Sequence, residues 1–390
     1  MRLLVILLLA ASLPGCSGLA NTSSPATPPA ASMDDWPRIS FQAAGFDPAI
    51  MQQLDAQLEA GFYSNTHMLT VEYDGKLVFE KYLSGDDENW GEPIGFRRFD
   101  ENSLHDLRSV SKSVTALLLG IALGDDFKAA LTRPVVAYFP ELIDQFAPGV
   151  EGVNLEQILT MSGGFEWNEM DVPYSNPEND ERQLYYADDP VAYLLGKPLR
   201  EKPGQRWYYN GGTTMLLAAL VAKISGQDFL EFAEQKLFTP LGINMTDVEW
   251  QGSGIWQRPL PSAASGLRLR ARDLAKIGSL MLHQGIWQGR QVVPAGWGEA
   301  SSQRRLEQAY DKWSMGGVYG YGYHWWQGRF DGVRGDFSAV TAVGYGGQRL
   351  FILPQRKLVL TLFAGNYGNG IHGVGEQILA KVVSAAPASP

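Results

Sequence analysis

The sequence predicts an α/β (α+β) fold in which one domain is built from both ends of the chain and a mainly helical domain is inserted between them. A strong hairpin signal lies near the start, where Asp74-Gly75 separates two runs of alternating apolar residues within 67–82. Helical periodicity dominates from about residue 110 to about 260. Strand patterns then return at Arg349–Leu353 and Lys357–Phe363, on either side of a turn at 354–356.

The elements follow in order once the globular part begins near Trp36. Asp47-Pro48 predicts a helix start with an aspartate N-cap, because proline suits the first helical position. Ile50, Leu54 and Leu58 then repeat every four residues and mark one buried face. Further helices are expected at 110–123, at 155–161, at 213–224, from Asp273 onward and at roughly 374–383.

Composition and charge exclude several classes of protein. The 390 residues are 45% apolar and 19% charged, which is typical of a globular chain and not of a disordered one. The net charge of −10 argues against general nucleic-acid binding, which requires clustered cations. The five histidines are scattered along the chain. No metal and no cofactor is therefore expected.

A G-x-G-x-x-G pattern spans Gly368 to Gly373 and resembles a dinucleotide-binding fingerprint. The chain ends about seventeen residues later without a further strand or a ribose-binding acid. We interpret the segment as a loop into the last helix.

The amino terminus predicts export. An apolar run from Leu3 to Leu13 follows Arg2 and has the length of a signal-peptide core. The only cysteine, Cys16, stands where a bacterial lipobox would place the lipidated residue. We expect a signal peptide at 1–15, a flexible tether at 16–35 and a lipid anchor, with Ser17 favouring the outer membrane facing the periplasm. The alternative is an ordinary secretory signal and a soluble periplasmic protein.

Ser109 and Lys112 carry the first chemical signal. They are three residues apart at the start of a predicted helix and so share one helix face. A serine hydroxyl is a weak nucleophile unless a neighbour takes its proton. A lysine can do so if it is neutral, which requires its pKa to fall by about three units. The alternative interpretation is a capped helix start with a surface lysine.

Two later segments complete a candidate site. Tyr208-x-Asn210 lies on a short loop before a helix, where an ionised phenol near cations can act as a general base. The tyrosines there could equally be core aromatics. Glycines around Gly344 would allow close approach of a substrate backbone, and a strand-edge N–H could form an oxyanion hole with the Ser109 N–H.

Together and in this order, these segments resemble the serine β-lactamase and penicillin-binding protein superfamily. The likeness is to its class C branch, with esterases and 6-aminohexanoate-dimer hydrolases, and runs from about Gly45 to Asn366. It includes further segments at 159–164, at 266–267 with 272–276, at 321–326 and at 346–348. The resemblance implies a β-lactamase/transpeptidase-like fold with an antiparallel sheet flanked by helices. It implies one catalytic domain at 36–386, with an α/β lobe at about 36–112 and 262–386 and a helical lobe at about 113–261.

The resemblance also implies roles for individual residues. Ser109 would be the acyl-forming nucleophile, Lys112 its proton partner and Tyr208 the general base and acid. Asn210 and Gly344 would position the substrate, and the backbone N–H groups of Ser109 and Tyr345 would bind the oxyanion. Where the branch often carries a cation, this chain has Ala342-Val343-Gly344. Efficient β-lactam hydrolysis is therefore not expected.

We therefore expect a metal-free serine hydrolase that cleaves an ester, a small amide or a peptide-like substrate through an acyl-enzyme. One alternative is a β-lactamase or D-alanyl-D-alanine carboxypeptidase. Another is a non-catalytic, penicillin-binding-like lipoprotein that recognises cell-wall fragments. The sequence predicts neither the physiological substrate nor the oligomeric state.

An acidic segment covers residues 166–189, with eight acids against the single base Arg182. One hypothesis is that it forms a wall near the cleft that repels anionic substrates and could accept an amine. The alternative is a solvated loop.

Overall fold

The computed structural model describes residues 36–252, 260–306, 318–332 and 335–387. These residues belong to one compact unit that begins at Trp36. The predicted signal peptide, the lipidation site at Cys16 and the tether lie outside the described residues. Within the described ranges, no helix is long and apolar enough to cross a membrane.

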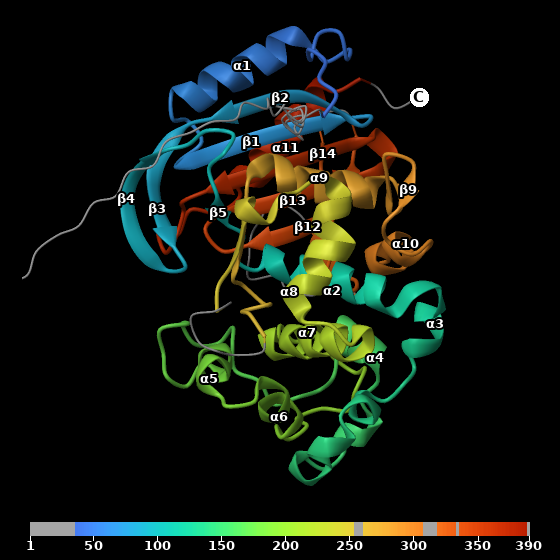
Figure 1. The fold of residues 1–390 in the computed structure, drawn as a ribbon. Coiled ribbons are helices and arrows are strands. Elements are labelled where there is room, and N and C mark those ends of the chain that lie inside the picture. The colour runs from blue at the N-terminus through green and yellow to red at the C-terminus, as the bar shows by residue number, and fades with distance from the viewer. Residues whose placement is uncertain (1–35, 253–259, 307–317, 333–334, 388–390) are drawn as a thin grey trace, which may run out of the picture. The chain divides into compact units, whose positions relative to one another are not determined.

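A seven-stranded sheet with the order β10-β11-β12-β13-β14-β1-β2 forms the centre of the unit, and all its pairs are antiparallel (Figure 1). The amino-terminal hairpin thus completes a sheet made by the carboxyl-terminal strands, with Val71 paired to Leu360. The strands are β1 (Thr66–Tyr73), β2 (Lys76–Tyr82), β10 (Val318–Tyr321), β11 (Trp326–Phe330), β12 (Phe337–Gly344), β13 (Gln348–Leu353) and β14 (Leu358–Ala364).

Helices cover both faces of this sheet. On one face, α1 (Pro48–Glu59) and α11 (Val374–Ala385) pack on side chains such as Phe351. On the other face, α2 (Val110–Leu123) and α9 (Ala271–Leu282) pack on alternate strand residues such as Leu350. Because successive strand residues point to opposite faces, the apolar strands β13 and β14 supply both cores.

Most of the chain between α2 and α9 is helical and loop-rich. Helix α7 packs against α2 and also contacts α4, α6 and α8. It is therefore the central helix of this part of the chain. The helices here are α3 (Phe127–Ala130), α4 (Leu155–Leu159), α5 (Asp180–Tyr186), α6 (Pro190–Leu195), α7 (Gly211–Ser225) and α8 (Phe229–Ala233). A further short helix, α10 (Trp297–Ser302), follows α9.

Smaller strand pairs surround the main sheet. Strands β3 (Ser84–Asn89) and β4 (Glu92–Arg98) form a two-stranded ribbon. A second small sheet has the order β5-β7-β6, and the remaining pair is β8 with β9. These strands are β5 (His105–Asp106), β6 (Val248–Trp250), β7 (Leu267–Leu269), β8 (Ile286–Trp287) and β9 (Arg290–Gln291).

The predicted fold class is confirmed, and several predicted elements match closely. Asp47 caps α1 by accepting from the N–H groups of Ala49 and Ile50, and α2 begins and ends where the sequence predicts. The predicted hairpin is β1 and β2. The ribbon β3–β4 and the strands β10 to β12 are not predicted by the sequence, because glycines and aromatic residues obscure the alternation there.

Strand β12 ends in close contact with the turn that precedes α2. A Cβ atom added at Gly344 would lie 2.3 Å from the carbonyl oxygen of Leu107. Only a glycine therefore lets the strand end reach this turn.

We predict that Gly344→Ala lowers the free energy of unfolding by about 1–3 kcal/mol, the usual range for overpacking a filled site. The measurement is urea unfolding followed by circular dichroism. Gly152→Ala is the matched control, because a Cβ there meets no atom within 4 Å. Equal stability of the two variants would contradict a close approach at Gly344.

Candidate active site

The candidate nucleophile, Ser109, follows a strained turn between β5 and α2. Arg108 adopts a φ of 49°, which is unusual for a residue with a side chain. Its guanidinium is held by Glu88 at 2.9 Å and Asp106 at 3.2 Å, so ion pairs stabilise the turn. Ser109 occupies the N-cap position of α2 but makes no side-chain cap hydrogen bond. Its hydroxyl is therefore not used to cap the helix.

The side chain of Lys112 turns toward Ser109 instead of toward solvent. Its Nζ donates to Ser109 Oγ at 3.3 Å and to the carbonyl oxygen of Ala264 at 3.1 Å. Lys112 is 1% exposed, whereas Ser109 is partly exposed. The predicted pair is thus brought together with a buried base and a reachable hydroxyl, and the alternative of a surface lysine is wrong.

Two buried glutamates from the acidic segment face the same ammonium group. Glu181 lies 3.7 Å and Glu169 4.0 Å from Lys112 Nζ. Glu169 accepts from the N–H of Gly211 at 2.7 Å and from the indole N–H of Trp167 at 2.8 Å. One lysine therefore shares its pocket with two carboxyl groups.

These carboxyl groups set the charge of Lys112. Burial alone lowers the pKa of Lys112, but Glu181, Tyr209 and Glu169 outweigh it and leave the pKa above its usual value. This is the reverse of the predicted fall. Burial and the charge of Glu181 raise the pKa of Glu169. Burial also favours protonated Glu181, but Lys112 and hydrogen bonds outweigh it and lower its pKa. These opposite shifts favour an ammonium at Lys112, a carboxylate at Glu181 and a protonated carboxyl group at Glu169.

The tyrosine that faces this group is Tyr209. Its ring lies 4.8 Å from Lys112 Nζ, and its side chain is 4% exposed. Burial raises the pKa of Tyr209 to about 12, and Lys112 and a hydrogen bond with Ser109 partly offset this rise. Tyr209 is thus a neutral phenol at physiological pH.

Tyr208, which the resemblance implied, is directed elsewhere. Its hydroxyl donates to Asp171 Oδ2 at 2.7 Å. The segment before α7 is extended, with a φ of −148° at Asn210, and neighbouring side chains in extended backbone point to opposite sides. The structure therefore brings Tyr209, and not Tyr208, to the Ser109–Lys112 pair. The doublet of tyrosines was the only signal in the sequence that a neighbour could take this place.

The remaining predicted residues have the following surroundings. Asn210 is the N-cap of α7, and its Oδ1 accepts from the Thr213 N–H at 3.1 Å. Gly344 contacts the turn beside Ser109, as described above. Tyr345 comes directly after β12, with a side chain that is 48% exposed and packs on Tyr367. The oxyanion roles of the Ser109 and Tyr345 N–H groups stay predictions.

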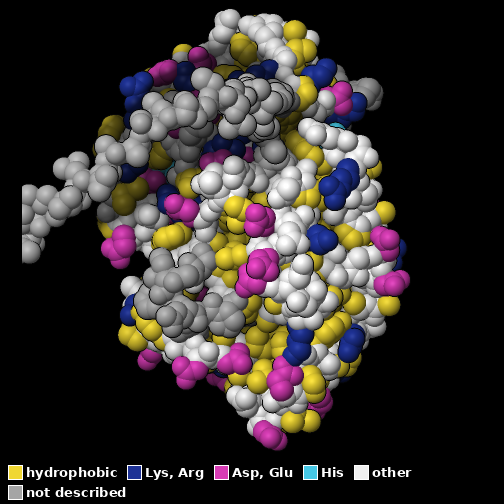
Figure 2. All heavy atoms as spheres, in the orientation of Figure 1, with side chains coloured by type: hydrophobic (Ala, Val, Ile, Leu, Met, Phe, Trp, Pro, Cys, Tyr) yellow, Lys and Arg dark blue, Asp and Glu magenta, His cyan; other side chains and the backbone are white. Residues whose placement is uncertain are grey.

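The acidic segment does not act as a single surface. Glu169, Asp180 and Glu181 are buried, while the other five acids are exposed. Asp180 binds Lys197 and the hydroxyl of Tyr193. On the face drawn in Figure 2, acidic and basic side chains of the described residues are interspersed. Sequence reasoning missed the roles of Glu169 and Glu181, because no spacing pattern links them to Lys112.

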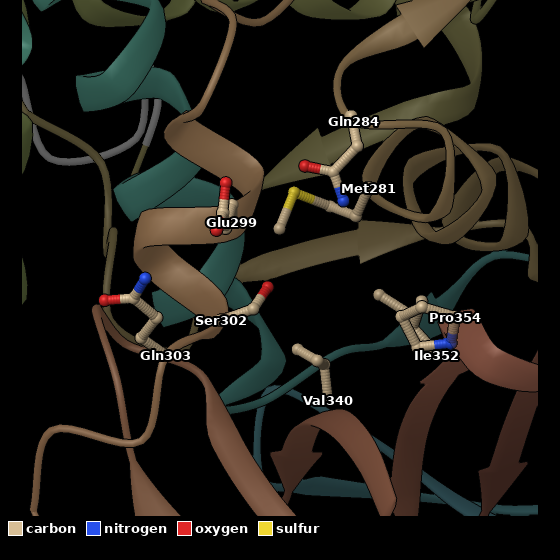
Figure 3. A pocket seen from close by; sticks show the side chains of 8 residues that line it. All are labelled: Met281, Gln284, Glu299, Ser302, Gln303, Val340, Ile352 and Pro354. Carbon is tan, nitrogen blue, oxygen red and sulfur yellow. The ribbon is translucent and has the colours of Figure 1, made fainter.

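A separate cavity of about 230 Å³ lies between α9, α10 and the paired strand residues Val340 and Ile352 (Figure 3). Figure 3 shows Glu299 and Ser302 reaching toward it from α10. It contains none of the predicted site residues. Its lining is Met281, Gln284, Glu299, Ser302, Gln303, Val340, Ile352 and Pro354.

Known proteins with similar sequences include a hydrolase and an esterase. The chain is 27% identical over 275 residues to the 6-aminohexanoate-dimer hydrolase of Paenarthrobacter ureafaciens, a match that covers 67% of this chain and 66% of that protein. It is 29% identical over 134 residues to the lovastatin esterase of Penicillium rubens, covering 33% of this chain and 29% of that protein.

The fold is shared with a penicillin-binding protein homologue from Caulobacter crescentus. The two have a TM-score of 0.65 at 17% identity, over 89% of this chain and 99% of that chain. A family model described as Beta-lactamase matches residues 56–380, which is most of the globular unit. The predicted superfamily and hydrolase class are thereby confirmed, and this chain belongs to the Beta-lactamase family.

Proposed function

We propose that this protein hydrolyses esters or small amides through an acyl-enzyme on Ser109, with Lys112 and Tyr209 as the proton-transfer groups. The observation that carries the proposal is the contact of Lys112 Nζ with Ser109 Oγ at 3.3 Å, beside a buried phenol. A serine is activated when a base lies within hydrogen-bond reach of its hydroxyl and a third group lies beside them.

The proposed reaction has two halves. After the Lys112–Tyr209 pair has released one proton to solvent, Ser109 Oγ attacks the substrate carbonyl and its proton passes to that pair. The bond to the leaving group then breaks, and the pair returns the proton to the leaving oxygen or nitrogen. Water then attacks the ester carbonyl on Ser109, gives its proton to the pair and releases the acid, and Ser109 regains its proton. The N-terminus of α2 favours negative charge on the carbonyl oxygen.

Ester or small-amide hydrolysis is favoured over β-lactam hydrolysis by the side chains on β12. Ala342 and Val343 are buried and apolar, so this stretch offers no cation for a substrate carboxylate. Relatives named as an amino-acid dimer hydrolase and an esterase support the same substrate classes. A β-lactamase or carboxypeptidase remains the alternative, and a panel of esters, amides and β-lactams distinguishes them.

We predict that a fluorophosphonate probe labels the folded protein on Ser109, and that Ser109→Ala abolishes both labelling and turnover of p-nitrophenyl butyrate. Mass spectrometry locates the adduct. Ser111→Ala serves as the matched hydroxyl control, because Ser111 Oγ is already bonded to the Arg108 carbonyl at 2.6 Å. Absence of an adduct on Ser109 would favour the non-catalytic alternative.

We predict that Tyr209→Phe lowers kcat by about 10²–10⁴-fold, the usual contribution of a proton-transfer group. Tyr208→Phe should change kcat by only a few-fold, because it loses a hydrogen bond to Asp171 outside this contact set. Steady-state kinetics on p-nitrophenyl butyrate compare the two. A larger loss in the Tyr208 variant would return the role to that residue.

We predict that kcat/KM rises with pH above neutrality, because the pKa values of Lys112 and Tyr209 are both raised and one of them must release a proton. Glu181→Gln removes the acid that contributes most to raising the pKa of Lys112, whereas the effect of burial remains. The pKa of Lys112 is therefore lower in this variant than in the wild type. The rising limb should then move to lower pH. Glu178→Gln, an exposed acid of the same segment, should leave it in place. Identical pH profiles for all three proteins would refute this electrostatic account.

A further inference from the structure

Three buried side chains from separate strands meet away from the contact set of Lys112. His67 comes from β1, Asp87 from β3 and His105 from β5, and none is more than 4% exposed. His67 Nδ1 lies 2.9 Å from His105 Nε2. Asp87 Oδ1 lies 3.4 Å from His105 Nε2 and 4.0 Å from His67 Nδ1. Three potential metal-ligand atoms thus converge on one point.

Hydrogen bonds on the outer side of each ring determine which nitrogens carry protons. Asn65 donates through Nδ2 to the carbonyl oxygens of Asp86 and Gly365, so its Oδ1 is the atom that faces His67. His67 Nε2 lies 3.0 Å from that oxygen and must carry a hydrogen to bond it. His105 Nδ1 lies 3.1 Å from the carbonyl oxygen of Asp106 and must carry a hydrogen for the same reason.

A neutral imidazole has only one N–H. With both outer hydrogen bonds formed, the inner nitrogens of His67 and His105 are both bare, and they face each other beside the Asp87 carboxylate. Two lone pairs at 2.9 Å with no hydrogen between them repel, so the cluster needs a cation at its centre. That cation is either a shared proton or a metal ion.

The dimensions of the cluster suit a metal ion. A triangle with these three sides has a point about 2.0 Å from every corner, within the bond lengths of about 2.0–2.2 Å that zinc makes with histidine nitrogen and carboxylate oxygen. That point lies in the plane of the three atoms, so a tetrahedral ion requires the Asp87 carboxylate to shift and a water molecule as the fourth ligand. Histidine ligands of metals usually donate their outer N–H to a carbonyl or carboxylate oxygen, as both rings do here. Phe99 stacks on His67 and Phe363 on His105, which holds the rings in place.

Charges of both signs surround the cluster. Arg108 and Arg268 are the nearby bases, and both bind Asp106, at 3.2 and 2.8 Å. Glu88 also binds Arg108. With Asp87, three carboxylates face two guanidinium groups, so the neighbourhood is net negative before any metal enters.

We propose that His67, Asp87 and His105 form a structural site for one divalent transition-metal ion, with zinc as the best match to the ligand set. Such an ion would join β1, β3 and β5 directly behind the turn that carries Ser109. The wide spacing of the histidines along the chain predicts no metal, and only the fold brings these side chains together. The proposal is independent of the reaction at Ser109.

The test measures metal in the full chain, produced without a polyhistidine tag in zinc-supplemented medium. Elemental analysis should find one equivalent of zinc per chain in the wild type and in the control His372→Gln, whose histidine is exposed. Asp87→Asn and His67→Gln should each hold at least ten-fold less. Wild-type zinc content near zero would leave a shared proton as the bridging cation and overturn the proposal.

A spectroscopic measurement on the wild type does not depend on variants that fold. X-ray absorption at the zinc edge should show two imidazole nitrogens and one carboxylate oxygen at about 2.0–2.2 Å, with a water oxygen as the fourth ligand. Any other set of protein ligands, or full zinc content in Asp87→Asn, would overturn the proposal as well.

Discussion

The site depends on a lysine ammonium that is buried without leaving its charge unbalanced. An isolated ammonium in an apolar interior loses its proton, because the desolvation of the charge is too unfavourable. Lys112 keeps its proton since Glu181 and Glu169 lie within 4.0 Å of its Nζ. The pKa values of the two glutamates are shifted in opposite directions, which reduces the repulsion between them. Ser109, Tyr209 and the loop at Glu169 all contact this ammonium group.

This balance explains why the site is assembled from distant parts of the chain. The start of helix α2 supplies Ser109 and Lys112, and the segment before α7 supplies Tyr209. The carbonyl oxygen of Ala264, later in the sequence, accepts a hydrogen bond from the ammonium group. The strained φ of Arg108 and the glycine at position 344 allow β12 to meet the same turn. Backbone strain of this kind persists only where surrounding contacts hold it, and here two carboxylates hold Arg108.

The histidine cluster differs in its electrostatics from the group around Lys112. Around Lys112, charges of both signs compensate each other. Around His67 and His105, fixed acceptors on the outer sides of the rings direct two lone pairs inward. The group around Lys112 contains exchangeable protons, whereas the histidine cluster provides ligand atoms for one bound cation. The two groups are close in the sequence, because β5 carries His105 and the turn after β5 carries Ser109.

Local sequence determined the helix α2, the hairpin β1–β2 and the Ser109–Lys112 pair, because each depends on residues only a few positions apart. The family resemblance supplied the order of the motifs and the antiparallel sheet. It assigned the tyrosine to position 208, since a spacing pattern cannot tell which of two adjacent side chains points inward.

Tertiary structure alone decided the rest. The choice of Tyr209, the pairing of Lys112 with Glu169 and Glu181, and the meeting of His67, Asp87 and His105 all join residues far apart in the chain. The proton states of these groups depend on burial and on charges brought near by folding, so no pattern along the chain specifies them.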